Sequence, residues 1–387
     1  MEWKEVRLGN VCEIYGRIGF RGYTTNDLVD TPKEGAISLS PKNIINGELN
    51  LEQCTYIKWD KYYESPEIMI NPNEIVITKT GSSVGRTTFV RRVVHPMTLN
   101  PQLVVLKNIS ENAEFLSYYI KSALFQSVLK SIVVGSAIPT LSQKNLANLM
   151  INVPKEVEDQ RRIASILSSL DRKIELNNKI NADLEEMAQA IFKNWFVDFE
   201  PFKDGKFVDS ELGMIPEGWK VGSLGDLITI KYGKDHKKLE DGTFSVYGSG
   251  GFMRFVNSWL YNGESVLIPR KGTLDNIMYV CEKFWTVDTM FFSVPKMDYV
   301  MKYVYNYIKR FDFSKMNEGT SVPSNTAARL NKMPILIPTH EILEMYDETL
   351  CPIYNKRKMK DKESRTLSLL RDTLLPRLMS GEIEIPE

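Results

Sequence analysis

The sequence predicts an α+β protein in which two similar globular domains are separated by two long helices that form an antiparallel coiled coil with pseudo-two-fold symmetry. Three observations predict this fold. The chain of 387 residues contains an internal repeat. Each copy carries short β-branched runs beside helical patterns, and each copy is followed by a long pattern with apolar residues at heptad spacing. A hydrophobic content of 43% and a charged content of 25% are ordinary for globular domains.

The internal repeat covers most of the chain. WKEVRLGNV begins at Trp3, and WKVGSLGDL begins at Trp219, 216 residues later (219 − 3). The block GSAIPTLSQKNLANLMINVP (135–154) matches GTSVPSNTAARLNKMPILIP (319–338) at an offset of 184 (319 − 135). Both blocks end in an apolar run that is closed by proline. The period is therefore that of two large domains, not that of a solenoid built from short repeats.

The repeat and the helical patterns divide the chain into five parts. These are a first domain over 1–154, a long central helix over 155–197, a linker over 198–218, a second domain over 219–338, and a C-terminal long helix with a tail over 339–387. The linker is predicted from its polar residues, glycines and prolines.

Each domain is predicted to contain short strands and one or two helices. IVIT (75–78), TTFVRRVV (87–94) and LVVL (103–106) are β-branched runs between turn residues. A helical pattern follows at 113–132 in the first copy and at 298–313 in the second. Strands and helices mixed in this way indicate the α+β class.

The central helix carries a narrow apolar stripe. Its predicted seam consists of Ile163, Leu167, Leu170, Ile174, Leu184 and Ile191. Asn177 and Asn181 stand where apolar residues are due, and buried asparagines fix the register of a coiled coil at some cost in stability. About 38 helical residues would extend roughly 57 Å. Such a stripe needs a second helix to cover it.

The C-terminal helix is the predicted partner. Its seam consists of Leu350, Ile353, Leu367 and Leu374. The middle of this seam holds Arg357, Lys360 and Ser364 instead of apolar residues. We therefore expect the pairing there to be loose or shifted in register.

Composition and charge exclude several classes of protein. Lys+Arg and Asp+Glu both number 49, so only a local basic patch would attract phosphates. No apolar run reaches the roughly 18 residues that a membrane span needs, and MEWKEVRLGN is not a signal-peptide pattern. The four cysteines and three histidines have no metal-ligand spacing. We expect a cytoplasmic protein with reduced thiols, no metal site and no membrane contact.

Motifs for catalytic chemistry are missing. The sequence contains no GxGxxG, GxxxxGK[ST] or HExxH. The amino-methyltransferase signature Asn/Asp-Pro-Pro-Tyr/Phe and a carboxylate-rich nuclease core are also absent. GSSVGRT (81–87) resembles a phosphate-binding loop, but it is one residue short and has arginine where lysine is required. We therefore expect no catalytic residues in this chain.

Two blocks carry a resemblance to a known family. They are EDQRRIASILSSLDRKIELNNKINADLEEMAQAIFKNWFVDFEP (158–201) and LRDTLLPRLMSGEIEI (370–385). Together with the doubled organisation, they resemble the helical regions of the specificity (S) subunit of type I restriction–modification systems. The resemblance covers essentially the whole chain. The polar middle of the second helix, described above, is where this sequence departs from it.

The resemblance implies a role and a set of partners. Each globular domain would read one half of a bipartite site in double-stranded DNA. The paired helices would set the half-site spacing and dock two modification (methyltransferase) subunits. Restriction (translocase and nuclease) subunits would complete the complex. S-adenosylmethionine, ATP and Mg²⁺ are then expected on the partner subunits, and no cofactor is expected in this chain.

Basic and amide side chains in loops at matching places of the two copies are the candidate DNA contacts. Cations and N–H donors bind phosphates, whereas bidentate and amide groups read base edges. In the first copy the candidates are Arg17, Arg21, Tyr23, Lys42, Asn43, Lys79, Ser82, Ser83 and Arg86. In the second copy they are Lys231, Lys234, His236, Lys237, Lys238, Arg270, Lys271, Thr273 and Asn276. The alternative for each loop is a solvated turn.

Two groups of aromatic residues and the function itself have alternative interpretations. Trp195 and Phe196 fit either a core or a protein-docking face. The alternative function is a coiled-coil scaffold that binds proteins instead of DNA. A helical stripe in the first domain is expected to pack in its core and not to stack on bases: Phe115, Tyr118, Tyr119 and Phe125.

Overall fold

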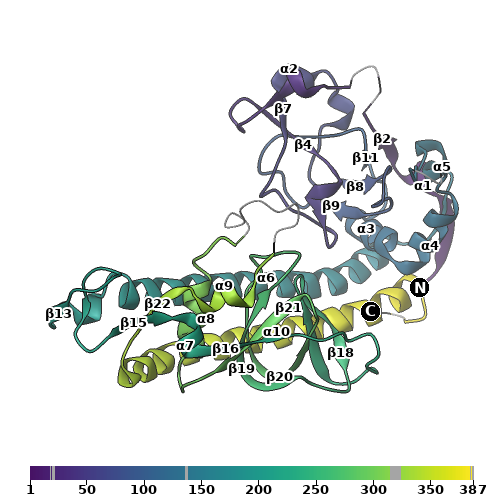
Figure 1. Ribbon diagram of the computed structural model, residues 1–387. Helices are drawn as coiled ribbons and strands as arrows, with labels where there is room; N and C mark the ends of the chain where they lie inside the picture. Colours follow the sequence, from purple (N-terminus) through teal and green to yellow (C-terminus); the bar gives the residue numbers. More distant parts are fainter. Residues whose placement is uncertain (18, 20–21, 136–137, 314–323, 384, 386–387) are drawn as a thin grey trace. The chain divides into compact units, whose positions relative to one another are not determined.

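The computed structural model describes residues 1–17, 19, 22–135, 138–313, 324–383 and 385. The chain forms two compact units, and each is described by itself. Unit 1 comprises Met1–Leu176 with Glu363–Glu387, and unit 2 comprises Asn177–Lys362. Each unit contains one globular domain and part of each long helix, α6 (Val157–Phe196) and α10 (His340–Met379) (Figure 1).

Two four-stranded sheets form the domain of unit 1. The first has the order β2–β11–β8–β9, and the second has the order β10–β4–β7–β3. Their bounds are β2 (Glu13–Tyr15), β11 (Leu103–Lys107), β8 (Ile75–Thr78), β9 (Thr87–Phe89), β10 (Met97–Leu99), β4 (Gly35–Leu39), β7 (Tyr56–Lys58) and β3 (Leu28–Val29). Strands β4 and β8 are buried along their whole length, including Ser38 and Thr78.

Short elements complete this domain. They are α1 (Leu8–Val11), η2 (Thr25–Asp27), η3 (Pro41–Asn43), β5 (Ile44–Ile45), β6 (Glu48–Leu49), α2 (Trp59–Tyr63), η4 (Pro66–Ile68), α3 (Ala113–Lys121), α4 (Ala123–Ser131) and α5 (Gln143–Ala147). Strand β1 (Trp3–Arg7) pairs antiparallel with β12 (Met150–Pro154), which ties the start of the domain to its end. The aromatic stripe is confirmed as core: Phe115, Tyr118, Tyr119 and Phe125 are all buried.

One six-stranded sheet forms the domain of unit 2, with the order β16–β21–β19–β20–β17–β18. Its bounds are β16 (Ile228–Tyr232), β21 (Met290–Pro295), β19 (Tyr261–Pro269), β20 (Met278–Thr286), β17 (Phe244–Gly248) and β18 (Gly251–Val256). The helices are α7 (Leu224–Leu227), α8 (Met301–Ile308) and α9 (Ala327–Asn331). Strand β15 (Lys220–Ser223) pairs antiparallel with β22 (Pro334–Ile337), as β1 does with β12.

The duplication is visible in strand order, although the two domains differ in the number of sheets. The order β2–β11–β8–β9 corresponds to β16–β21–β19–β20. In unit 2, β20 pairs with β19 and then runs parallel to β17. In unit 1, residues 90–96 interrupt the equivalent strand, and β10 makes the parallel pairing with β4. One continuous strand therefore gives one sheet in unit 2, and its interruption gives two sheets in unit 1.

The segment 198–218 is folded to a greater extent than its composition indicates. It contains η5 (Glu200–Phe202) and the hairpin of β13 (Phe207–Val208) and β14 (Ile215–Pro216). Phe202 packs on Trp219 with ring centroids 5.2 Å apart. The ring centroid of Phe196 lies 4.6 Å from that of Tyr303 and 4.7 Å from that of Tyr346. Phe196 is therefore core, and Trp195 packs partly buried beside it.

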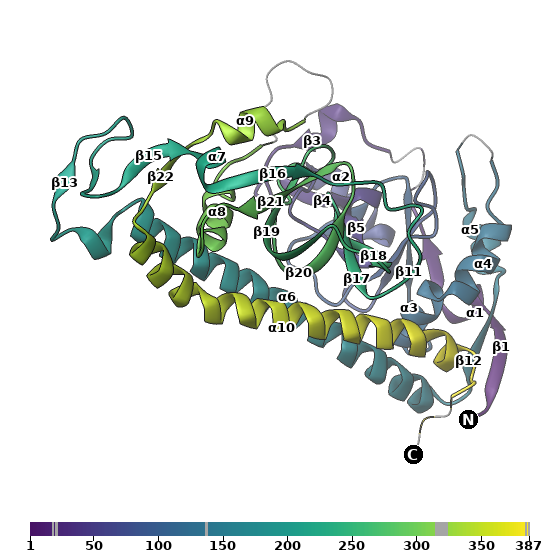
Figure 2. The same ribbon diagram turned by 60° about the horizontal axis from the view of Figure 1, so that its bottom comes forward.

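The helices α6 and α10 run antiparallel. In unit 1, Asp171 accepts a hydrogen bond of 2.8 Å from Arg371. In unit 2, Asn181 donates to Asp361 over 2.6 Å, and Glu185 forms an ion pair with Arg357. As the number on α6 rises by ten and then by four, the number on α10 falls by ten and then by four. The same register therefore holds in both units, with the helices side by side (Figure 2).

The apolar seam is well covered only where a domain core reaches it. Ile163 and Leu167 are buried in the core of unit 1, with Leu374 partly buried against it. Leu350 and Ile353 are buried in the core of unit 2, with Leu184 and Ile191 partly buried against it. The remaining predicted seam residues, Leu170, Ile174 and Leu367, are half-buried. The predicted seam residues are thus most deeply buried where they join a domain core.

Charged groups hold the middle of the second helix. Besides its ion pair with Glu185, the Arg357 guanidinium lies 5.4 Å from the ring centre of Tyr354 and 5.9 Å from that of Tyr305. The expected looseness at this position is therefore wrong, because a fixed arginine replaces the missing apolar residue. Asn177 is fully buried, and its side-chain amide has no hydrogen-bond partner among the described residues.

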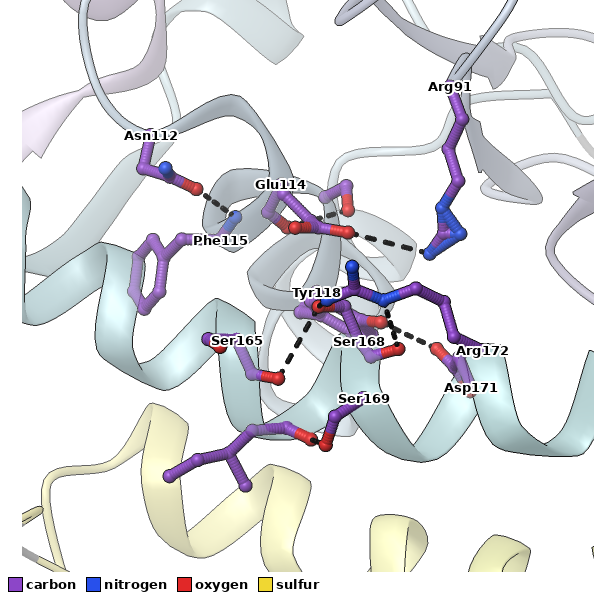
Figure 3. Close-up of polar contacts among 12 residues, drawn as sticks. Arg91, Asn112, Glu114, Phe115, Tyr118, Ser165, Ser168, Ser169, Asp171 and Arg172 are labelled. Atoms are coloured by element: carbon purple, nitrogen blue, oxygen red, sulfur yellow. Dashed lines mark hydrogen bonds and ion pairs between the residues drawn. The ribbon is translucent and has the colours of Figure 1, made fainter.

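The first domain is attached to α6 by hydrogen bonds from α3 and the turn before it. Tyr118 donates from its hydroxyl to Asp171 over 2.6 Å, and both side chains point toward each other between the helices (Figure 3). Gln160 is fully buried, accepts from the backbone N–H of Asn112 at 2.8 Å, and donates to Glu111 at 2.5 Å. Asp171 therefore joins three helices, because it also accepts from Arg371 of α10.

In unit 2, α8 is attached to α10 in a comparable way. The buried Lys302 amine lies 2.6 Å from Asp347 of α10 and 3.2 Å from Glu264 of β19. Asn306, which is fully buried, donates to the hydroxyls of Tyr346 and Tyr354 at 3.1 Å and 3.0 Å. Both domains are thus held on a long helix by buried polar groups that periodicity does not reveal.

Replacing Asp171 with alanine is expected to lower the local free energy of unfolding around α3 by about 2–3 kcal/mol, because a tyrosine hydroxyl and an arginine lose a charged partner together. Asp372→Ala is the matched control. Asp372 also contacts Arg371, but its side chain is 62% exposed, so we expect a loss below about 0.5 kcal/mol. Hydrogen exchange of the α3 amides measures both losses, and equal exchange in the two variants would contradict this account.

Candidate nucleic-acid interface

In unit 1, the loop 79–86 is a tight connection between β8 and β9. Gly81 and Gly85 have φ angles of +103° and +90°, a conformation that glycine adopts without a steric penalty. The backbone N–H of Thr78 donates to the carbonyl oxygen of Arg86 at 2.8 Å, and the backbone N–H of Gly85 donates to the carbonyl oxygen of Thr78 at 2.9 Å. Ser82 and Arg86 are exposed and Ser83 is half-buried. The loop therefore presents a hydroxyl and a guanidinium from a backbone of defined shape.

The surroundings of this loop do not fit catalysis. The five residues from Gly81 to Gly85 have the spacing GxSxG, and the longer segment resembles a phosphate-binding loop. Both of those sites require a strand followed by a helix. Here the loop joins two antiparallel strands instead. Ser83 is therefore not placed as a nucleophile, and the loop is not the start of a phosphate-binding helix.

Lys79 lies at the start of the same loop and is half-buried. Burial lowers the pKa of its amine. It lines a hollow of about 570 Å³ together with Gln102 and Gln143, two residues that the sequence did not single out. Their signal was not visible because they lie 41 positions apart (143 − 102) and meet only through the fold.

Arg17 makes its contacts inside the domain of unit 1. Arg17 is 5% exposed, and its guanidinium donates to the carbonyl of Leu99 at 2.8 Å and to Thr98 at 3.2 Å. It also lies 5.2 Å from the ring centre of Tyr23, whose hydroxyl is 2.8 Å from that of Ser38. Burial lowers the pKa of Arg17. The expectation that Arg17 faces DNA is therefore wrong, and Arg21 lies outside the described residues.

Asn43 is also a structural residue. It is 1% exposed, and its side-chain amide oxygen accepts from the backbone N–H and the hydroxyl of Ser40, both at 3.0 Å. Its amide nitrogen donates to the carbonyl oxygens of Asn50 and Gln53. The expectation that Asn43 reads a base is wrong, because both ends of its amide are occupied. Its neighbour Lys42 is exposed and donates to Thr55 at 3.3 Å.

In unit 2, an arginine shapes the basic loop after β16. Arg254 of β18 donates to the carbonyl oxygens of His236 and Leu239 at 2.7 Å and 2.8 Å, and to Nδ1 of His236 at 3.3 Å. The loop therefore has a defined course. It displays three exposed lysines, Lys234, Lys237 and Lys238, and the exposed Lys231 lies just before it on β16. His236 is half-buried and serves as an acceptor inside the domain.

The loop between β19 and β20 presents a second set of polar groups in unit 2. Lys271 and Thr273 are exposed on either side of Gly272, which has a φ of +88°. Asn276 donates its amide to the carbonyl of Ser249 at 2.9 Å. Its amide is therefore used in shaping the loop.

Arg270 begins this loop and contacts an exposed aromatic ring. Its guanidinium donates to the carbonyl of Asp288 at 3.2 Å and lies 5.4 Å from the ring centre of Tyr232. Tyr232 is 55% exposed. The sequence did not point to Tyr232, although an exposed ring beside an arginine and lysines is suited to contact with nucleic acid.

The same backbone framework supports the basic loop in both units. The backbone N–H of Lys79 donates to the backbone carbonyl oxygen of Gln102 at 2.8 Å. The backbone N–H of Arg270 donates to the backbone carbonyl oxygen of Thr289 at the same distance. Each loop also pairs with the segment before the short helix that follows: Thr80 bridges to Thr140 in unit 1, and Lys271 bridges to Ser324 in unit 2. The two domains thus hold their basic loops with equivalent backbone hydrogen bonds.

A family model for the type I restriction modification DNA specificity domain matches residues 1–186 and 216–360. The match includes both domains and part of each long helix. This chain belongs to the type I restriction–modification DNA specificity family.

Relatives in this specificity family match the chain over its length. The type I restriction enzyme MjaIX specificity subunit of Methanocaldococcus jannaschii is 26% identical over 431 residues, covering 100% of this chain and 94% of the relative. The HindI specificity subunit of Haemophilus influenzae is 22% identical over 470 residues, covering 99% and 100%.

A solved member of the specificity family has the same fold. The S subunit of a type I restriction–modification system from M. genitalium superposes with a TM-score of 0.58 at 18% identity, covering 97% of this chain and 96% of that one. Similarity at this level of identity concerns the fold alone.

In the part of the chain that the structure describes, no helix is long and apolar enough to cross a membrane. Within the same residues, no group of three or more His, Cys, Asp or Glu side chains is placed to hold a metal ion.

Proposed function

We propose that this chain is the non-catalytic DNA-recognition subunit of a type I restriction–modification complex. Each domain reads one half of a bipartite target in double-stranded DNA, and the α6–α10 helix pair sets the distance between the halves. The observation that carries this proposal is the pair of basic loops on one shared backbone framework, one in each unit, in a chain of the specificity family.

The exposed groups support recognition of DNA in particular. Arg86 in unit 1 and the lysines of the loop after β16 in unit 2 are exposed cations, which suits contact with phosphates. The chain has equal numbers of acidic and basic residues, so its attraction to DNA is local to such loops. The framework behind the loops fixes their position, as sequence reading requires.

The partner subunits carry the chemistry in this proposal. Two modification subunits, docked on the helix pair, transfer a methyl group from S-adenosylmethionine. Restriction subunits use ATP and Mg²⁺ for translocation and cleavage. This chain supplies the sequence address to both. The proposal agrees with the sequence, which contains none of the phosphate-binding, metalloprotease or amino-methyltransferase motifs sought above.

The test is to map methylated adenines in DNA treated with the complex of this chain and its modification subunits. We expect one motif with two short half-sites at a fixed spacing, and loss of methylation when the spacing changes by one base pair. Methylation without sequence preference would contradict the proposal. Co-purification of protein partners together with a lack of any DNA preference would instead favour a scaffold.

A further inference from the structure

The hollow beside the first basic loop is lined by side chains that can read bases. Its polar lining includes Lys79, Thr80, Gln102, Thr140 and Gln143. All of these belong to unit 1, where strands β8 and β11 and helix α5 bring them together. The hollow is therefore a feature of one domain and needs no second domain to form.

The Gln102 amide is hydrogen-bonded within the domain, and the Gln143 amide lies against the backbone of Gly16. Gln102 accepts from the amide of Asn100 at 3.2 Å through its side-chain oxygen, and its backbone N–H donates to the same residue at 2.9 Å. Gln143 lies over Gly16, because a Cβ placed on Gly16 would come within 2.6 Å of the Gln143 amide nitrogen. Glycine at this position leaves room for that amide. An oriented amide loses less conformational entropy when it binds a base.

The second domain has the same backbone arrangement with different side chains. Lys79 in unit 1 and Arg270 in unit 2 make equivalent backbone hydrogen bonds, to Gln102 and Thr289 respectively. Gln102 and Thr289 therefore occupy corresponding positions. The backbone N–H of Leu141 donates to the carbonyl oxygen of Lys79 at 2.8 Å, and the backbone N–H of Asn325 donates to the carbonyl oxygen of Arg270 at 3.0 Å.

The first residues of the two short helices correspond as a result. Ser142 caps α5 and Thr326 caps α9, so Gln143 corresponds to Ala327. The set of lysine and two glutamines in unit 1 is therefore arginine, threonine and alanine in unit 2. A conserved framework is needed for folding, whereas side chains that differ on that framework can encode different sequences.

We propose that Gln102 and Gln143, with Lys79 beside them, are specificity-determining residues that read base edges in the half-site of the first domain. This inference rests on the proposed function and deepens it. Glutamine reads adenine through paired hydrogen bonds to N6 and N7 in the major groove, and lysine donates to O6 and N7 of guanine. The half-site read by the first domain therefore contains adenine at the position that faces each glutamine.

The experiment is to select targets from DNA with both half-sites randomised, using the assembled modification complex with wild-type, Gln143→Ala and Gln102→Ala chains. Each variant is expected to lose roughly 5- to 150-fold of its discrimination at one base pair of the first half-site, as the loss of one bidentate contact predicts. Gln143→Glu is expected to change the preferred base from adenine to cytosine, because a carboxylate accepts from the cytosine amino group. The second half-site stays unchanged in all three variants.

Gln53→Ala is the matched control, since Gln53 is an exposed glutamine of the same domain outside the hollow. It is expected to leave both half-sites unchanged. Retained selection of the second half-site shows that a variant is folded and assembled. An unchanged base preference in both alanine variants, or an equal loss at all positions of the first half-site, would overturn the proposal. If the wild-type complex selects no bipartite site, the proposed function itself fails.

Discussion

Replacing Lys234, Lys237 and Lys238 with alanine is expected to weaken DNA binding by the assembled complex roughly 100-fold at physiological salt. These lysines are exposed on the loop that Arg254 shapes. Each lysine that neutralises a phosphate releases condensed counterions, so its loss costs more affinity at low salt than at high salt. The slope of log K against log salt is expected to become about three units shallower.

Fluorescence anisotropy with a labelled target, over a series of salt concentrations, measures this change. The matched control replaces Lys203, Lys206 and Lys220, three exposed lysines of the segment before the second domain and its first strand. The net charge of the chain falls equally in both triple variants. A loss of affinity of the same size in both would show that the effect is one of overall charge and not of this loop.

Lengthening both long helices together is expected to change the spacing of the half-sites without changing their sequences. The design inserts four helix-forming residues after Leu176 in α6 and four after Lys362 in α10. The two insertions lie at the boundary between the compact units. Asp171 then keeps Arg371 within unit 1, and Asn181 keeps Asp361 within unit 2.

Four helical residues add about 6 Å, and one DNA base pair rises about 3.4 Å. The methylated motif is therefore expected to have a spacer longer by one or two base pairs, as read by methylation sequencing. A four-residue insertion in the loop between β13 and β14 is the control, because this exposed loop lies outside the helix pair. An unchanged spacer with both half-sites still methylated would exclude the helices as the ruler.

The duplication and the long helices could be predicted because their signals are local or periodic. Trp3 and Trp219 open two copies whose strand order agrees. The central helix over 155–197 agrees with α6 to within two residues at each end, and the C-terminal helix predicted from residue 339 begins one residue before α10. An apolar stripe at helical spacing has one stable arrangement in water, which is against another apolar surface.

The candidate interface could be predicted only in part. Ser82, Arg86 and Lys271 were expected on loops, because glycine beside short polar residues is a strong local signal for a turn. The structure places all three at the surface. Arg17 and Asn43 also stand near glycines and polar residues in the sequence, but both side chains are buried. Arg17 bonds to a carbonyl 82 positions away, and no local pattern indicates such a partner.

Spacing along the chain was enough to predict the repeat, the two long helices and the family resemblance. Which polar residues face solvent, by contrast, depends on the packing of the folded domains. That packing buried Arg17 and Lys302 with partners from a distant strand and a distant helix, and it buried Asn43 against residues of its own turn. It also brought Gln102 and Gln143 to one hollow. The physical reason is that burial and contact depend on which strands pair, and strand pairing joins residues whose separation in sequence has no period.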